Sequence, residues 1–328
     1  MHVKAAWQQQ LANAIRDPLA LLQHLEIEDQ VQLADPASHQ SFACRAPLPF
    51  VNRIEKGNPL DPLLRQVLPI NDELIITPGY STDPLLELEH TPQQGLLHKY
   101  HGRVLLTLTG ACAIHCRYCF RRHFPYADHS LSRERWQGAL QYIKQHHDIH
   151  EVIFSGGDPL TSKDAQLQQM IIDLEAVPHI TTLRFHSRLP IVIPSRITDS
   201  LCQMLNQSRF RCVMVIHCNH ANEIDSHVQA ALEALQTHRV SVLNQAVLLQ
   251  GVNDNTPALR ALSERLHQAY VLPYYLHLLD ATQGAAHFNV GESRAIELMT
   301  QLQGQLPGYL VPRLAKEEAF KEAKTVVF

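Results

Sequence analysis

Apolar and polar residues follow two different spacings along most of this 328-residue chain. From about residue 103, short apolar runs typical of buried strands recur roughly every thirty residues. These predicted strands are Val104–Leu108, Glu151–Phe154, Thr181–Phe185, Val213–His217, Val240–Gln245 and Tyr274–Leu278. Stretches with helical spacing follow them at Ser132–His146, Lys163–Glu175, Asp199–Gln207, Ser226–His238, Pro257–Ala269 and Ser293–Leu302. Six such alternations predict βαβ units and a parallel sheet, either as an open partial barrel or as a doubly wound sheet.

Residues 1–95 have a different pattern, in which helical stretches alternate with proline-rich connections. Ala5–Ile15 and Pro18–Leu25 have apolar residues at helical spacing. Asp61-Pro62 and Asp83-Pro84 each place an acid suited to an N-cap before a proline suited to the first helical position. We therefore expect a mainly helical N-terminal extension over residues 1–95, an α/β domain over 96–305 and a short C-terminal segment over 306–328.

Composition excludes several classes of protein. A hydrophobic content of 45% and a charged content of 18% are ordinary for a globular enzyme. The formal charge of −4 provides no electrostatic case for a nucleic acid or a membrane surface as the main partner. No stretch approaches the roughly 18 apolar residues that span a bilayer, and the N-terminus lacks the apolar core of a signal peptide. A cytoplasmic location is the resulting expectation.

Three of the seven cysteines, Cys112, Cys116 and Cys119, lie within eight residues, directly after the first predicted strand. The others are scattered, which is a poor disulfide framework. The C-x3-C-x2-C spacing allows a zinc site, with His115 or His123 as a fourth ligand, or an electron-transfer cluster, which needs a fourth cysteine. It also allows a [4Fe–4S] cluster whose fourth iron stays open to a small molecule.

Polar residues stand where the other predicted strands end. They are Ser155-Gly156-Gly157-Asp158-Pro159, His186-Ser187-Arg188, His217-Cys218-Asn219-His220, Asn244-Gln245 and Asp280. Chemistry in parallel α/β folds gathers at the carboxyl ends of the strands. We therefore expect these residues and the cysteine loop to line one mouth.

The cysteine spacing, its position after the first strand and the aromatic Tyr118 before the third cysteine resemble the radical S-adenosylmethionine (radical SAM) superfamily. Flanking segments extend the resemblance to the lysine 2,3-aminomutase family over about residues 40–328. They are His98–Leu106, Cys119–Arg122, Ser155–Leu160, His217–Glu223, Leu243–Leu249 and His287-Phe288. The chain is most similar to the short branch that makes (R)-β-lysine for modification of elongation factor P. This resemblance implies a partial (β/α)6 radical SAM barrel and an isomerase.

The resemblance also implies three cofactors. A [4Fe–4S] cluster on the three cysteines would cleave SAM to a 5′-deoxyadenosyl radical, and pyridoxal phosphate (PLP) would bind the substrate. Residues matched to SAM and the PLP ring are Ser155, Gly156, Gly157, His217 and Gln245, and those matched to the PLP phosphate are Lys99, Tyr100 and Arg103. Lys324, twelve residues beyond Gly308-Tyr309-Leu310-Val311-Pro312, matches the PLP-linked lysine. Because the family's glycine run before it is missing here, Lys316 and Lys321 compete for that role.

The implied substrate is L-lysine. Arg121 matches the residue that binds its carboxylate, and Asp280 and Glu317 match the acids that hold its distant ammonium. The resemblance further implies a reduced electron donor and a functional link to elongation factor P and its lysyl ligase. It implies no zinc, because the chain lacks the extra cysteines of longer relatives, and leaves a homo-oligomer as an alternative to a monomer. Two other functions stay open: an aminomutase for another amino acid such as glutamate, and a non-catalytic iron–sulfur or zinc module.

Overall fold

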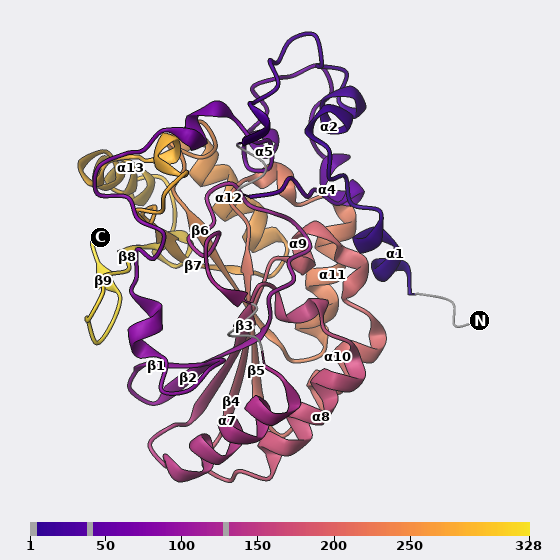
Figure 1. The fold of residues 1–328 in the computed structure, drawn as a ribbon, viewed down its shortest axis with the longest axis vertical. Helices are drawn as coiled ribbons and strands as arrows, with labels where there is room; N and C mark the ends of the chain where they lie inside the picture. The colour runs from indigo at the N-terminus through magenta and orange to yellow at the C-terminus, as the bar shows by residue number, and fades with distance from the viewer. Residues whose placement is uncertain (1–4, 38–41, 127–130) are drawn as a thin grey trace.

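A computed structural model describes residues 5–37, 42–126 and 131–328 (Figure 1). A nine-stranded sheet runs through it in the order of the chain, β1 to β9. The strands are β1 (Leu96–Tyr100), β2 (Arg103–Thr109), β3 (Glu151–Gly156), β4 (Thr182–Ser187), β5 (Arg211–His217), β6 (Ser241–Val247), β7 (Leu272–His277), β8 (Arg313–Lys316) and β9 (Thr325–Val326). Strands β2 to β8 are parallel, whereas β1 and β9 pair antiparallel at the two edges. The sheet is therefore an open, partial barrel.

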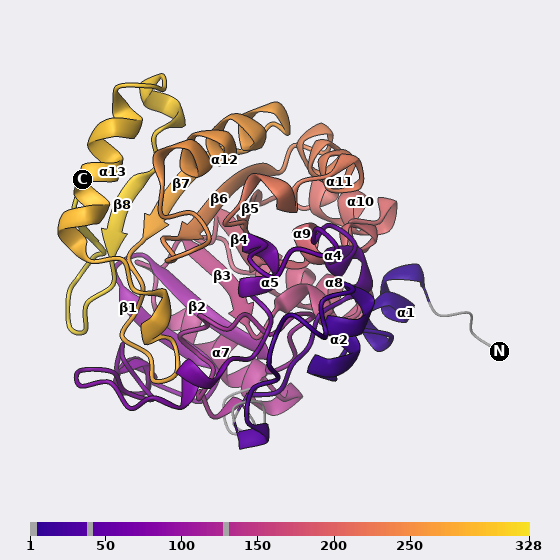
Figure 2. The same cartoon turned by 90° about the horizontal axis from the view of Figure 1, so that it is seen from above.

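Helices follow the parallel strands and cover the outer side of the curved sheet (Figure 2). They are α7 (Arg133–Gln145), α8 (Asp164–Glu175), α10 (Asp199–Gln207), α11 (Ser226–Thr237), α12 (Thr256–Gln268) and α13 (Glu292–Gln303), with the single-turn α9 (Leu189–Val192) after β4. Four begin at a polar N-cap whose side chain accepts a backbone N–H: Ser132, Thr198, Asp225 and Asn255. Their apolar faces pack on the sheet in one large core, which holds the carboxyl ends of the strands in place.

The N-terminal extension contributes α1 (Ala6–Ala12), α2 (Pro18–His24), α4 (Leu48–Val51) and α5 (Pro62–Arg65), and short 3-10 turns η1 (Asn71–Leu74) and η2 (Glu87–His90). At α5, Asp61 accepts from the backbone N–H groups of Leu63 and Leu64, as the Asp-Pro pair predicts. No helix among the described residues is long and apolar enough to cross a membrane.

The structure corrects the prediction of a helix at Asp83-Pro84. The chain turns there instead, and the 3-10 turn η2 begins only at Glu87. Leu86 adopts a left-handed conformation with φ of 48°, which interrupts a helix that continues from Pro84. The sequence pattern also did not predict strands β1, β8 and β9, which are short or half-exposed.

Candidate active site

The cysteine loop follows β2 and is held by the N-terminal extension. The backbone N–H of His115 donates to Arg45 O at 3.0 Å, and that of Arg117 donates to Gln66 O at 2.9 Å. The fully buried guanidinium of Arg117 also donates from Nε to Glu73 of η1 at 2.8 Å. A buried charge is stable only when it is paired in this way. The loop is therefore fixed at both its backbone and its side chains.

The three thiols of this loop lie within electrostatic reach of one another. Burial raises the pKa of Cys112, and the nearby Cys119 and Cys116 raise it further. Burial and Cys116 raise the pKa of Cys119 to about 12. Within the described ranges, no three His, Cys, Asp or Glu side chains converge on a single metal ion. Cluster ligands need not converge so closely, because each thiolate binds a different iron.

Arg188, just beyond the end of β4, places a cation directly against this loop. Its Nη1 donates to Cys116 Sγ at 2.7 Å, while its Nη2 donates to Gln66 Oε1 at 2.6 Å and to Glu223 Oε2 at 3.0 Å. All four residues are at least half-buried. Arg188 therefore connects Cys116 to the N-terminal extension and to the loop after β5.

The end of β3 packs directly on the cysteine loop. Gly157 donates to Thr109 O at 2.6 Å, and a Cβ added at Gly157 would lie 2.5 Å from Ala111 O. Gly156 has φ of +119°, and its Cβ would lie 2.5 Å from Thr109 O. Both positions therefore need glycine, for backbone approach and, at Gly156, also for conformation. Asp158 then accepts from Ser187 Oγ at 2.7 Å, which joins the ends of β3 and β4.

His217 and Gln245 are direct neighbours at the ends of β5 and β6. Burial is the largest of the effects that lower the pKa of His217 to about 3, so the ring is neutral at physiological pH. Its Nε2 is buried without a hydrogen-bond partner, and its ring lies 5.6 Å from that of Tyr118. An unpaired buried nitrogen beside the cysteine loop is suited to contact a bound ligand.

Arg121, two residues after Cys119, is paired with Glu87 of η2. Its Nε and Nη2 donate to the two Glu87 oxygens at 2.7 and 2.6 Å, and its Nη1 donates to Ser155 Oγ at 3.4 Å. Burial opposes the charged form, but Glu87 raises the pKa of Arg121 above its usual value. A cavity of about 120 Å³ lies beside this pair, lined also by Phe120 and Phe124.

Five more predicted residues meet where strands β1 and β2 face the C-terminal hairpin. Lys99 Nζ donates to Glu317 Oε1 at 2.8 Å, Tyr100 Oη donates to the same oxygen, and Lys324 Nζ donates to Glu317 Oε2. The Arg103 guanidinium lies 4.8 Å from the centre of the Tyr100 ring. Burial alone would raise the pKa of Glu317, but Lys324, Lys99 and Tyr100 lower it to about 2. The carboxylate is therefore ionised.

Asp280 lies beyond the end of β7 and connects these groups electrostatically. Burial raises its pKa to about 7, while Lys324 opposes the rise and Glu317 and Glu87 add to it. Glu317 and, from η2, Glu87 thus lie close enough to Asp280 to disfavour its ionised form. A cation that enters this site would favour the ionised form of Asp280.

The two competing lysines point elsewhere. Lys316 Nζ pairs with Glu292 of α13 at 2.9 Å, and Lys321 is exposed in the hairpin loop. Of these three lysines, Lys324 is the one that contacts Glu317 and so joins the group on β1. Glu87 and Glu73 are neighbours that the sequence did not predict, because a carboxylate in a helical or turn segment gives no local signal. Arg188 was expected at the mouth from its place at a polar strand end, but without a role of its own.

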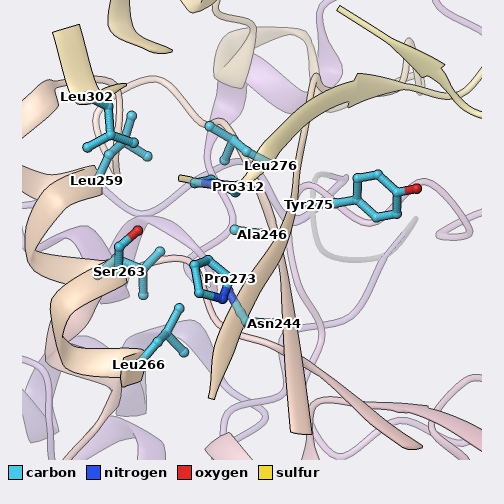
Figure 3. Close-up of a pocket in the computed structure, with 11 residues that line it drawn as sticks. Asn244, Ala246, Leu259, Ser263, Leu266, Pro273, Tyr275, Leu276, Leu302 and Pro312 are labelled. Atoms are coloured by element: carbon cyan, nitrogen blue, oxygen red, sulfur yellow. The ribbon is translucent and has the colours of Figure 1, made fainter. Parts of the chain in front are cut away.

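An apolar pocket between α12 and the sheet lies outside this mouth (Figure 3). It is lined by Leu259, Leu266 and Pro273, among others, and about 10 Å³ of it is open. Figure 3 shows Tyr275 on the other side of its strand from Leu259 and Leu266. Because Lys324 Nζ lies 6.0 Å from the Tyr275 ring, that ring belongs to the mouth, and the apolar pocket is a packing gap.

Comparison with known proteins agrees with this arrangement. The Radical SAM superfamily matches residues 106–197. The L-lysine 2,3-aminomutase of Escherichia coli (strain K12) is 51% identical, over 97% of this chain and 93% of that one. The corresponding protein of Haemophilus influenzae is 48% identical over 98% and 95%, and that of Clostridium subterminale is 33% identical over 98% and 77%.

Among solved structures, a radical SAM methyltransferase from Sphaerobacter thermophilus superposes with a TM-score of 0.50 at 14% identity. The match covers 67% of this chain and 68% of that one, and it supports the fold alone. The Escherichia coli and Haemophilus influenzae relatives match this chain over nearly their whole lengths, at about half identical residues. The chain belongs to the L-lysine 2,3-aminomutase family of radical SAM enzymes.

Proposed function

We propose that this protein is an L-lysine 2,3-aminomutase that converts L-lysine to (R)-β-lysine. The observation that carries the proposal is the distribution of charge at the mouth. Arg121 lies at one part of it, and Asp280 and Glu317 lie within electrostatic reach of each other at another. An amino acid with a carboxylate at one end and an ammonium at the other matches this arrangement, whereas glutamate would bring a second anion to Asp280.

The residues of the cysteine loop fit a [4Fe–4S] cluster and SAM. Cys112, Cys116 and Cys119 would bind three irons, and the buried cation of Arg188 would offset the negative charge of the thiolates. The close approach of Gly157 to Ala111 leaves backbone groups accessible beside the loop. His217 offers an unpaired nitrogen and Gln245 an amide to the same ligand. Ser155, next to Gly156, would complete this set.

The cationic group on β1 fits PLP. Lys99, Tyr100 and Arg103 would bind its phosphate, and Lys324, which pairs with the same Glu317, would hold its aldehyde end. Together the three cofactors would supply hydrogen abstraction from an unactivated carbon and delocalisation of the resulting unpaired electron. The chain would supply orientation: Arg121 fixes the carboxylate of the substrate, while Asp280 and Glu317 fix its distant ammonium.

The charges of the site also determine its protonation. Glu317 is ionised, whereas Asp280, with a pKa of about 7, gains its negative charge when a cation arrives. The neutral His217 adds no charge beside the cluster. The substrate's ammonium would therefore stabilise the ionised form of Asp280 beside the charged Glu317.

The product would be used to modify elongation factor P through a separate lysyl ligase, and an external reductant would supply the electron. The similarity over almost the full length of the short Escherichia coli relative supports the assignment to the short branch. A homo-oligomer is consistent with exposed apolar side chains such as Ile75 and Ile76, which are 60% and 81% exposed.

The test is anaerobic reconstitution with iron, sulfide, PLP, SAM, a reductant and L-lysine, followed by chiral analysis of the products. We expect (R)-β-lysine. An intact cluster that yields no β-lysine from L-lysine would overturn the proposal, and a product from L-glutamate would favour the alternative substrate.

The assignment of Lys324 has its own test. Borohydride reduction of the PLP-loaded protein, followed by peptide mass spectrometry, should place the pyridoxyl group on Lys324. Lys321→Ala should keep this label and Lys324→Ala should lose it. A label on Lys316 or Lys321 in the unaltered protein would transfer the role to that residue.

A further inference from the structure

The carboxylate of Glu317 is already fully engaged by other side chains, which is not expected of a substrate-binding residue with no substrate bound. Its two oxygens accept from Lys99, Tyr100 and Lys324, which are three donors proposed above to serve the cofactor. The side chains of Glu317 and Lys99 are only 10% and 12% exposed. In this state the donors for PLP are occupied by a carboxylate of the chain itself.

The hairpin geometry explains how Glu317 reaches these donors. Lys316 pairs with Thr325 across β8 and β9, so Glu317 and Lys324 are the next positions on either side of the hairpin loop. Their ion pair closes the neck of that loop. A backbone contact from Lys99 Nζ to Glu318 O at 3.2 Å holds the same hairpin against β1.

The positive charge near Glu317 favours replacement of its carboxylate by a phosphate group at the same donors. Lys99 and Lys324 both pair with this carboxylate, and a third cation, Arg103, lies beside the Tyr100 ring and pairs with no carboxylate among the described residues. A phosphate dianion has the charge and the number of acceptor oxygens that suit this surplus, whereas a carboxylate does not. A phosphate that takes the Lys99 and Tyr100 donors leaves Glu317 without them.

Once Glu317 no longer accepts from Lys99 and Tyr100, its carboxylate can act together with Asp280. Its charge raises the pKa of Asp280, so the two carboxylates already lie within reach of each other. Two ionised carboxylates without a cation repel, and an ammonium group between them relieves that repulsion. Release of Glu317 therefore creates the acidic pair that attracts the distant ammonium of the substrate.

On the basis of the proposed function, we propose that Glu317 is an internal anion that occupies the phosphate-binding donors in the cofactor-free protein. Binding of the PLP phosphate displaces it toward Asp280, where it binds the substrate's ammonium. The cofactor must then bind before L-lysine, and one residue connects the two sites. Glu317 competes with the cofactor and assists the substrate, so a single substitution should change the two affinities in opposite directions.

The experiment uses cluster-reconstituted protein from which PLP has been removed, with PLP binding measured by isothermal titration calorimetry. Glu317→Gln keeps the shape of the side chain and removes its charge, so PLP should bind about tenfold more tightly. In PLP-loaded protein, the same variant should bind L-lysine about tenfold more weakly. Glu318→Gln is the matched control, because the neighbouring Glu318 carboxylate is half-buried and, among the described residues, accepts from Thr325 Oγ1 of the same hairpin and not from the donors on β1. It should change neither affinity.

A measurement on the unaltered protein avoids any effect of the substitution on folding. Inorganic phosphate, added to PLP-free protein, should increase its affinity for L-lysine, because phosphate also displaces Glu317. Equal or weaker PLP binding by Glu317→Gln, or phosphate without effect on L-lysine, would overturn the inference while leaving the proposed function intact. If the unaltered protein binds no PLP at all, the proposed cofactor itself is wrong.

Discussion

Arg121 and Glu87 form a two-point ion pair in which Nε and Nη2 of the guanidinium donate to the two carboxylate oxygens at 2.7 and 2.6 Å. The side chains are 8% and 13% exposed, so solvent screens the pair only weakly. This pairing uses one edge of the guanidinium. It directs the remaining Nη1 toward Ser155 at 3.4 Å, beside the cysteine loop, which is where we propose that the substrate carboxylate binds.

Arg121→Lys should weaken substrate binding. An ammonium cannot donate along two parallel directions, so lysine at this position cannot hold Glu87 and a second carboxylate in the same geometry. We expect KM for L-lysine to rise about tenfold or more, with a smaller loss of kcat, in steady-state assays. Arg260→Lys is the control, because Arg260 forms an exposed pair with Glu264 on α12. An unchanged KM in Arg121→Lys would contradict the carboxylate-binding role.

Each cysteine of the loop should be required for iron. Cys112→Ala, Cys116→Ala and Cys119→Ala should each lose most of the bound iron and the visible absorbance of the cluster after anaerobic reconstitution. Cys202→Ala is a suitable control, because Cys202 is buried in the core on α10. Full iron content in any of the three loop variants would show that this thiol is not a ligand.

Gly157→Ala should disturb the cysteine loop without altering any polar side chain. The added methyl group would lie 2.5 Å from Ala111 O and 2.8 Å from the Gly110 carbonyl carbon, which are backbone atoms that cannot rotate away. A shift of this kind costs roughly 1–3 kcal/mol in the free energy of unfolding. We expect a lower midpoint in urea and weaker SAM binding by calorimetry.

The control for this variant is Gly308→Ala. Position 308 is exposed in the 3-10 turn η7 (Gly308–Leu310), needs no left-handed backbone and has no atom within 4 Å of an added Cβ. It should unfold at nearly the same urea concentration as the unaltered protein. If both variants behave alike, the close contact at Gly157 has no energetic effect.

Binding of L-lysine should strengthen as the pH rises through neutrality. The pKa of Asp280 is about 7, chiefly because of burial, so only part of the population carries the negative charge at that pH. Raising the pH from about 6 to about 8 ionises the rest and increases the attraction for an ammonium. Calorimetry with PLP-loaded protein would measure this. The trend should be lost in Asp280→Asn.

The raised pKa of Asp280 also predicts how the stability of the protein depends on pH. Its folded-state pKa lies above the reference value of 3.8, so the folded protein binds more protons and the free energy of unfolding falls between these two pH values as the pH rises. Above pH 7 this destabilisation is complete. Asp280→Asn should therefore be more stable than the unaltered protein at high pH, in thermal unfolding of the PLP-free form. Equal stability at all pH values would exclude an ionisation penalty at this site.

Local signals predicted most of the elements. Apolar runs identified β2 to β7, and helical spacing identified α7 to α13 apart from the single turn of α9, because both patterns depend on residues close in the chain. The Asp-Pro signal succeeded at Asp61 and failed at Asp83. At the second position the left-handed Leu86 turns the chain, and its conformation follows from tertiary packing that a dipeptide does not encode.

The sequence by itself determined the order of strands and helices, the cysteine loop and the polar strand ends. These features follow from spacing along the chain and from the rule that functional residues of parallel sheets gather at the carboxyl ends of the strands. Only the tertiary structure decided which charges meet there. Glu317 reaches Lys99 and Tyr100 because β8 and β9 form a hairpin opposite β1, and Glu87 reaches Arg121 because η2 folds against the cysteine loop. Contacts between residues so distant in the chain depend on strand order and hairpin register, which no local pattern records.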